Sequence, residues 1–269
     1  MQELADHYVR GVAPAYTEEK LISSKSDMPR DSKLPFISRL LVKHANKQWA
    51  KEGHTLTYGE YHSFANSFIR SHKVSHTLEL TEEDELKDML EKCRSKNVTL
   101  NDQLLAQMFI DENTDKIIIA GDIRDKLACY NKGAMGNYST SFSVEIKGRG
   151  SDVFALAKTV HDKVQKKMQK NSDLYLVLQC YADLDPALLD AAFISAAGGF
   201  ESKAGLFIGD MFFGMSSPKG YCITNLGRIE SDTIDGAFFI PPASPAIRKT
   251  KGVLTVNGNM RICTSIREG

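Results

Sequence analysis

The sequence has no long apolar run and no surplus of charge of either sign. None of its apolar stretches approaches the roughly 18 residues that a membrane-spanning helix requires. Lysine plus arginine number 34, and aspartate plus glutamate also number 34, so no overall field draws the chain to nucleic acid or to an anionic membrane. The pattern of a secretory signal, basic and then apolar, is missing from the first residues, MQELADHYVRG. We therefore expect no membrane span and no nucleic-acid partner.

Cysteine is sparse, and its spacing is irregular. The five cysteines are widely scattered along the chain: Cys93, Cys129, Cys180, Cys222 and Cys263. An odd number at these distances gives neither a disulfide framework nor a zinc knuckle. We expect five free thiols, no metal site and a reduced, cytoplasmic environment.

The motifs of free-standing active sites are also missing. The sequence contains no GxSxG, P-loop, GxGxxG, CxxC pair or HExxH, and no two histidines are adjacent. His72 and His76 are four residues apart, but they lie where a strand is predicted to start, and that spacing does not bring them to one metal. His161 lies beside the buried stripe of a predicted helix, which indicates a boundary residue rather than a general base.

The first quarter of the chain has weak periodicity. A short helix is predicted over residues 2–9, followed by a long surface connection over 12–35 that holds three prolines. A second helix is predicted from Phe36 to about Lys51, with Gly53 as its stop. We interpret residues 1–75 as an N-terminal helix, a connection and a second helix, and residues 76–269 as one lobe.

Within 76–269, helices and strands alternate. A strand is predicted from His76, and capping boxes at 81–84 and 99–102 predict the starts of two helices. The apolar run 116–124 is typical of a buried strand, and the strict alternation over 138–146 predicts a strand with one polar face.

The remainder is helical and then rich in strands. A helix is predicted after Ser151, and residues 174–215 are apolar and mostly helical. Strands are predicted at 221–229 and at 236–240, followed by a hairpin around the turn Asn257-Gly258. This order predicts an α/β fold, a two-layer sandwich in which helices cover one side of a mixed β-sheet.

Polar clusters occur at three predicted strand ends. The run GDIRDKL places Arg124 at the end of a buried strand, and GNYSTS begins the alternating strand with Asn137 and Ser139. The run TNLGRI interrupts an apolar strand with Asn225. Each cluster by itself is also explained as a strand end where amides satisfy backbone groups.

In order and spacing, four runs resemble one known family. They are NVTLNDQLLAQMF, IIIAGDIRDKL, MGNYSTSFSVEI and YCITNLGRI. Together they resemble the second lobe of the chloramphenicol-acetyltransferase-like superfamily, which includes condensation domains of nonribosomal peptide synthetases, polyketide-associated acyltransferases and alcohol O-acetyltransferases. The resemblance covers about residues 76–269. It implies transfer of an acyl group to an alcohol or amine, with a coenzyme A thioester or a phosphopantetheine-linked acyl group as substrate and no bound cofactor.

The resemblance also implies a missing part. In that family the first lobe ends in HHxxxDG, whose second histidine is the general base, and this sequence contains no such motif. The first residues, MQELADHYVRGVAPAY, resemble the helix that follows it. We therefore expect a C-terminal half whose partners are an N-terminal lobe carrying HHxxxDG and an acyl-CoA or carrier protein. By itself the chain is expected to be inactive and prone to self-association.

By the same resemblance, residue roles are assigned to the polar clusters. Thr224 is implied as an auxiliary oxyanion donor, with Asn225 shaping its strand, and no base is expected in this chain. Asn137 and Ser139 are implied to lie beside the substrate tunnel. Arg124 is a further binding candidate, although its place favours a structural ion pair with Asp122 or Asp125. The alternative function, from a different class, is a non-catalytic module that binds a partner.

Overall fold

The computed structural model describes residues 7–13, 15–20, 22, 24–134, 136–148, 150–215, 220–242 and 244–268. Residues 7–10 are helical, and the rest of the predicted first helix lies outside the described residues. The longer helices are α2 (Phe36–Glu52), α3 (Tyr58–Ser71), α4 (Glu83–Ser95), α5 (Leu100–Asp111), α6 (Val153–Gln169), α8 (Leu176–Asp183) and α9 (Pro186–Ala197). The short ones are η1 (Lys25–Asp27), η2 (Arg124–Lys126), α7 (Asn171–Leu174), α10 (Lys203–Ile208) and η3 (Gly209–Phe213). In the part of the chain that is described, no helix is long and apolar enough to cross a bilayer.

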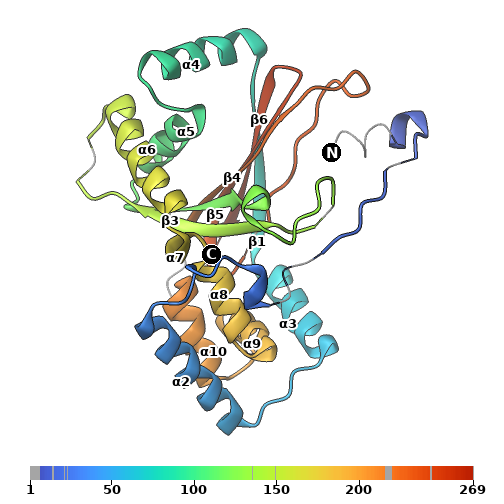
Figure 1. Ribbon diagram of the computed structural model, residues 1–269, viewed down its shortest axis with the longest axis vertical. Helices are drawn as coiled ribbons and strands as arrows, with labels where there is room; N and C mark the ends of the chain where they lie inside the picture. The colour runs from blue at the N-terminus through green and yellow to red at the C-terminus, as the bar shows by residue number, and fades with distance from the viewer. Residues whose placement is uncertain are drawn as a thin grey trace.

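The strands form one mixed sheet of six in the order β1-β6-β5-β4-β2-β3. Their bounds are β1 (Lys73–Thr81), β2 (Lys116–Asp122), β3 (Ser139–Glu145), β4 (Gly220–Ile229), β5 (Ile247–Val256) and β6 (Asn259–Glu268). The central strand β4 is parallel to both of its neighbours, β2 and β5, whereas the other pairs are antiparallel. Figure 1 shows α4, α5 and α6 together on one side of this sheet.

The larger hydrophobic core lies between the sheet and α4–α6. Strands β2 and β3 contribute Ile117 and Ile119, which pair in register with Val144 and Phe142, and all four are buried. Fully buried Phe109 of α5 packs in the same cluster. We call this the core face of the sheet. Alternation along each strand sends the intervening side chains to the opposite face, which we call the outer face.

The outer face is partly covered by the connection between β4 and β5. Residues 236–240 were predicted as a strand, and this prediction is wrong, because they run as an irregular segment. Phe239 lies against Gly252 of β5, so close that a Cβ there would be 2.7 Å from its ring. The Ser265 hydroxyl of β6 donates to the Pro241 carbonyl at 2.6 Å. The run lies across the sheet instead of joining it, with Phe239 half-buried and Phe238 and Ile240 exposed.

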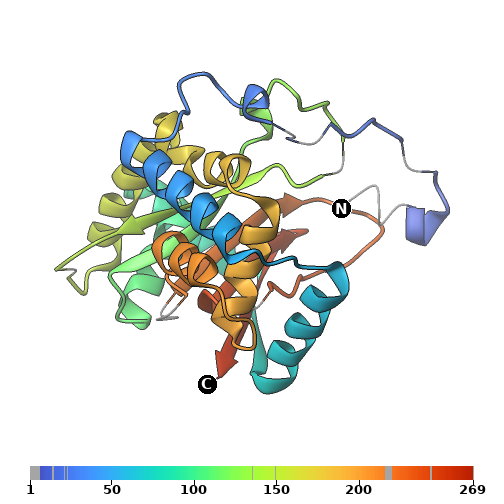
Figure 2. The same cartoon turned by 90° about the horizontal axis from the view of Figure 1, so that it is seen from below.

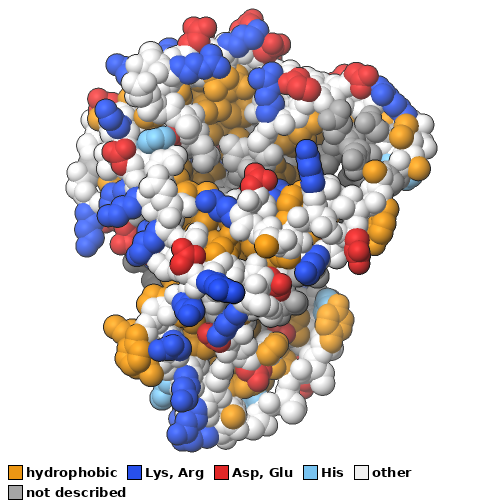
Figure 3. Space-filling view, viewed as in Figure 1, with side chains coloured by type: hydrophobic (Ala, Val, Ile, Leu, Met, Phe, Trp, Pro, Cys, Tyr) orange, Lys and Arg blue, Asp and Glu red, His pale blue; other side chains and the backbone are white. Residues whose placement is uncertain are grey.

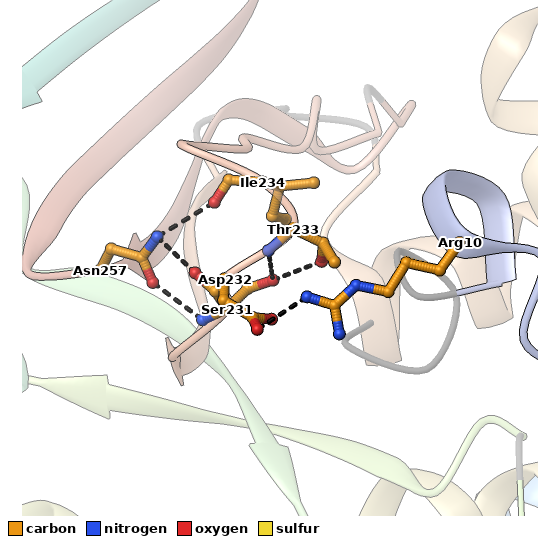
Figure 4. Close-up of polar contacts among 6 residues, drawn as sticks. All are labelled: Arg10, Ser231, Asp232, Thr233, Ile234 and Asn257. Atoms are coloured by element: carbon orange, nitrogen blue, oxygen red, sulfur yellow. Dashed lines mark hydrogen bonds and ion pairs between the residues drawn. The ribbon is translucent and has the colours of Figure 1, made fainter.

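The same connection is held near its start by a side chain of the hairpin turn. The Asn257 amide makes three hydrogen bonds with the backbone of Ser231 and Ile234, of 2.8 to 3.0 Å (Figure 4). Arg10, from the N-terminal segment, forms an ion pair with Asp232 at 2.7 Å. Two segments that are more than 200 residues apart in the sequence therefore meet at this loop.

A second core is entirely helical. Helix α2 buries Val42, Ala45 and Trp49 among residues of α8, α9 and α10, including Leu184 and Leu188. Seen from below in Figure 2, α2, α9 and α10 lie side by side. The predicted bounds of α2 and its stop at Gly53, which has φ of 66°, are confirmed. The division of the chain at residue 75 stays a prediction. Helix α2 lies before that point but shares its core with residues beyond it.

Two local predictions at helix starts have different outcomes. The capping box at 99–102 is confirmed: the Thr99 hydroxyl accepts from the Asp102 amide at 3.1 Å, and the Asp102 carboxylate accepts from the Thr99 amide at 2.8 Å. The box at 81–84 is wrong, because Thr81 is the last residue of β1 and α4 begins after Glu82 without a side-chain cap. Strand pairing to β6 has taken the residue that would otherwise cap the helix.

Candidate functional site

A cavity of about 530 Å³ opens beside the outer face at the β3 edge of the sheet. Polar side chains of β3 form its floor, and apolar side chains of α8 form its wall. The lining residues are Ile22, Ser24, Ala120, Asn137, Ser139, Thr140, Ser141, Val177, Leu178, Tyr181 and Ala182. Two of the residues predicted from the sequence, Asn137 and Ser139, are therefore brought together in one concave site.

The floor is built by the polar side of the alternating strand. Thr140, Phe142 and Val144 are buried, whereas Ser139 and Ser141 are accessible on the outer face. The Asn137 side-chain oxygen accepts from the Ser139 amide at 3.2 Å and from its hydroxyl at 2.6 Å. This arrangement fixes the Asn137 carboxamide at the strand start, and hydroxyl groups of Ser139 and Ser141 face the cavity.

The wall of the cavity comes from α8. Val177 and Leu178 provide apolar surface, and Tyr181 adds a partly exposed aromatic ring. Burial raises the pKa of the Tyr181 phenol above its ordinary range, and the neighbouring Cys180 acts in the same direction. The phenol is therefore neutral at physiological pH and is able to donate as well as accept a hydrogen bond.

Thr224 lies on the same outer face, two strands from the cavity floor. It is half-buried and pairs in register with Gly252. The ladder between β4 and β2 ends one residue earlier, at Ile223 and Ile119. Thr224 and Ser141 are thus separated by the width of β2, which is roughly 10 Å for two strand spacings. Thr224 does not line the cavity, but it borders the same surface.

Asn225 has a local role that the structure shows directly. Its side-chain oxygen accepts from the Gly227 amide at 2.8 Å, and the ladder with β5 is irregular between Asn225 and Arg228. Gly227 has φ of 83°, a backbone conformation that favours glycine. The side chain of Asn225 therefore stabilises a bulge in β4 and is exposed beyond Thr224.

Arg124 forms an ion pair at the end of β2. Its guanidinium lies 2.5 Å from the carboxylate of Asp122, and its backbone amide donates to the same carboxylate at 3.0 Å. Asp122 pairs in register with Ser139, so the pair adjoins the cavity without lining it. Of the two partners considered from the sequence, Asp122 is the one in contact.

The lining residues supply hydrogen bonds and apolar contact but no proton-transfer pair. No histidine occurs among the described residues that line the cavity. His161 lies elsewhere, between α6 and α5, where its Nδ1 is 2.8 Å from the Asp102 carboxylate that caps α5. Its ring is partly buried, which places it at the boundary position that the helical pattern predicts. The cavity by itself is equipped to bind and orient a ligand.

Sequence reasoning missed the wall of the cavity. The run containing Val177, Leu178 and Tyr181 was predicted as apolar and helical, but no signal separated its cavity side from its core side. Ile22 also lines the cavity from the long N-terminal connection. Local periodicity does not indicate that a residue so distant in the sequence lines the cavity.

Comparisons with known proteins show likeness in structure alone. No protein-family profile matches the sequence, and no curated protein matches it. The trichothecene 15-O-acetyltransferase TRI3 from Fusarium sporotrichioides is similar with a TM-score of 0.50 and 10% identity, over 73% of this chain and 43% of that one. The epimerization domain of the third module of tyrocidine synthetase B has a TM-score of 0.49 and 12% identity, over 98% of this chain and 59% of that one. Against these two structures, the chain spans about half of their length.

A mixed sheet covered by helices and the match to an O-acetyltransferase confirm the fold class expected from the sequence. The identity is too low to carry any function across. The chain has a mixed α/β fold similar to that of the O-acetyltransferase TRI3.

Proposed function

We propose that this chain is the C-terminal half of a two-lobed acyltransferase that moves an acyl group from coenzyme A or a carrier thioester to an alcohol or amine. The observation that carries the proposal is the cavity on the outer face, with Asn137 and Ser139 in its lining. The fold supports it, because TRI3 is a 15-O-acetyltransferase that the chain matches over 43% of its length. The general base, in an HHxxxDG motif, would come from the other half.

Thr224 fits the role of an auxiliary donor by its position. It borders the outer face near the cavity, and its hydroxyl is not buried in the core. A donor aimed at a developing oxyanion stabilises the transition state more than the ground state. The hydroxyl of Thr224 would supply such a hydrogen bond once the other lobe holds the thioester against this face.

Exposed apolar side chains on the outer face support the proposal that a second lobe covers this face. Leu78 and Leu80 of β1 lie in register with Cys263 and Arg261 and are about half exposed. Phe238 and Ile240, on the connection that crosses the outer face, are also about half exposed. Apolar surface of this kind on one face marks an interaction site more often than an isolated monomer surface. A missing first lobe would cover it; without that lobe, self-association would.

The first test is activity with and without the other lobe. The purified chain with acetyl-CoA and a panel of alcohols and amines should show no turnover above background, because a positioned base contributes roughly 10²–10⁴-fold. Fusion behind a lobe of about 130–180 residues ending in HHxxxDG, the size of one domain, should restore turnover. We expect the DNA upstream of this coding sequence to encode such a lobe. Turnover by the chain alone, abolished by changing one of its own histidines, would contradict the proposal.

The second test compares two serines of one strand in the active fusion. Ser141 lines the cavity, whereas Ser143, two residues further on the same face of β3, does not. Ser141→Leu should reduce kcat/KM roughly tenfold or more by filling the site, and Ser143→Leu should leave it near the parent value. Equal effects of the two changes would show that the cavity has no part in the reaction.

A further inference from the structure

Helix α2 has an outward face with a row of positive charges. Arg39, Lys43, Lys47 and Lys51 follow one another at every fourth position and are all exposed. The opposite side of the helix is buried against α8–α10 through Val42, Ala45 and Trp49, so the row is fixed on a rigid support. Over twelve residues it extends for roughly 18 Å at 1.5 Å per residue. In Figure 3, basic side chains run along the lower left of the molecule, where α2 lies in Figure 1.

Among the described residues, these four cations have no carboxylate partner in an ion pair. Across the described ranges, no ion pair joins any of them to a carboxylate. The acidic residue of the helix, Glu52, is engaged at its end, where its carboxylate accepts from the Ser202 hydroxyl at 2.7 Å and from the Ala204 amide at 2.9 Å. Burial raises the pKa of Glu52, but hydrogen bonds from Ser202, Ala204 and Gln48, together with the nearby His54, lower it overall. Its carboxylate therefore favours the ionised form in this contact.

The row is not explained by the stability of the helix itself. The first turn of α2 has no acidic residue, and cations near a helix N-terminus oppose the macrodipole. Helix α6 offers a comparison. Its exposed Lys158, Lys163 and Lys166 have Asp162 among them, and its last turn places lysines where the macrodipole favours them. Only Arg39, near the start of α2, is opposed by the macrodipole, whereas Lys51 in the last turn is favoured by it. Helix stability therefore does not account for the whole row.

Apolar side chains stand beside the cations at one end. Phe36 and Ile37 are 63% and 70% exposed, and Leu40 is 49% exposed. The Arg39 guanidinium lies 5.6 Å from the centre of the Phe36 ring, so the aromatic and the cation form one surface. An apolar anchor next to a row of like charge is a common composition for a protein interface.

We propose that the outward face of α2 docks an acidic helical surface of another protein. Carboxylates one turn apart on such a helix match the spacing of the cations, and an apolar side chain of the partner contacts Phe36, Ile37 and Leu40. A bilayer fits this surface less well. An interfacial helix needs an apolar face along its length, but the long apolar face of α2 is already buried in the second core, and the exposed apolar residues are confined to its first turns.

Binding of a defined peptide tests the docking surface. The probe is a fluorescein-labelled, alanine-based helical peptide of 18 residues with a glutamate at every fourth position and two leucines, titrated with the full chain by fluorescence anisotropy. The parent chain should bind it, and binding should weaken as salt is raised. The triple change Lys43→Glu, Lys47→Glu and Lys51→Glu should weaken it roughly tenfold or more. Phe36→Ser should also weaken it, with less change in salt dependence.

A matched control has the same change of charge on another helix. Lys158→Glu, Lys163→Glu and Lys166→Glu on α6 should leave peptide affinity within about twofold of the parent. Circular dichroism and urea midpoints check that both triple variants are folded. Absence of saturable binding by the parent, or equal loss in both triple variants, would overturn the proposal. Tighter binding to phosphatidylserine vesicles than to the peptide, lost in the α2 variant, would also overturn it, because the ligand would then be a lipid surface.

Discussion

Asn257 and Ser231 are joined by two hydrogen bonds of 2.8 Å, one accepted by the asparagine Oδ1 from the serine amide and one donated by Nδ2 to the serine carbonyl. Asn257 is also the first central residue of the β5–β6 turn, with φ of 48°. The same residue therefore sets the turn of the hairpin and anchors the start of the connection that crosses the outer face.

Asn257→Gly separates these two roles. Glycine adopts the positive φ without strain, but it removes all three side-chain hydrogen bonds to residues 231–234. The free energy of unfolding should fall by about 1.5–4.5 kcal/mol, since three bonds are lost and each net hydrogen bond contributes about 0.5–1.5 kcal/mol. Urea titration measures the change. Asn257→Asp keeps the acceptor and should lie between parent and glycine variant; no loss in either would show that the connection is held elsewhere.

Trp49→Ala tests the shared core of α2 and α8–α10. Trp49 is 5% exposed within the second hydrophobic cluster, and truncation of a buried tryptophan typically costs about 3–5 kcal/mol. Leu40→Ala is the control on the same helix, because Leu40 is about half exposed and should change stability by less than about 0.5 kcal/mol. Circular dichroism in urea compares them.

The same core bears on the predicted boundary at residue 75. A chain that begins at residue 76 would expose Leu184 and Leu188, which are buried beside α2. We expect this fragment not to fold cooperatively. A sharp unfolding transition from the fragment would show instead that residues 1–75 are a linker.

The cysteine thiols should be unreactive toward thiol reagents in the folded protein. All five cysteines are free and buried, as expected from their spacing. Burial raises the pKa of Cys222 to about 12, and burial with the nearby Asp183 raises that of Cys180 to about 12. Thiol titration should count five per chain after unfolding without reductant and far fewer before it. A count of three or one would reveal disulfides.

The direction of these shifts predicts a loss of stability in alkali. In the unfolded chain thiols ionise near their ordinary pKa of about 8.5, whereas in the folded chain Cys180 and Cys222 stay protonated up to about 12. Their contribution is therefore complete below pH 8.5 and is lost as pH rises towards 12. The urea midpoint should fall between pH 7.5 and pH 10, and it should fall less in the double variant Cys180→Ala, Cys222→Ala. An equal fall in the double variant would assign the effect to other groups.

Thr224→Ala should lower kcat in the two-lobed fusion while stability stays close to the parent. Loss of an oxyanion donor costs about 10²–10³ in rate, and for an auxiliary hydroxyl we expect about a hundredfold or less. Thr224→Ser keeps the hydroxyl and should retain most of the rate. Unchanged kcat in a folded alanine variant would give Thr224 a purely structural role.

Local signals in the sequence predicted those parts of the fold that depend on neighbouring residues. The Asn257-Gly258 turn, the capping box of Thr99 and the alternation in β3 are each set by contacts within a few residues. Helix α3 was missed although Thr57 and Glu60 form a capping box and Tyr61, Phe64 and Phe68 recur at helical spacing. The exposed face of α2 was equally hard to predict, since Ile37 and Leu40 are apolar but are exposed.

The site could be predicted only in part, for the same physical reason. Asn137 and Ser139 were singled out as a polar cluster at a strand start, and the family resemblance implied their place beside the site. Their cavity also depends on Tyr181 of α8 and on Ile22, which reach it through tertiary packing. No pattern within a short window encodes that approach.

Gly252 links the covered part of the outer face to the candidate site. In the sheet it pairs in register with Thr224 of β4, and on the outer face it lies against the ring of Phe239. Even a methyl group at this position would push that ring away from the sheet. A lineage that lost this glycine would therefore have to reshape the loop between β4 and β5. Because Gly252 pairs with Thr224, that constraint lies directly beside the strand that bears Thr224.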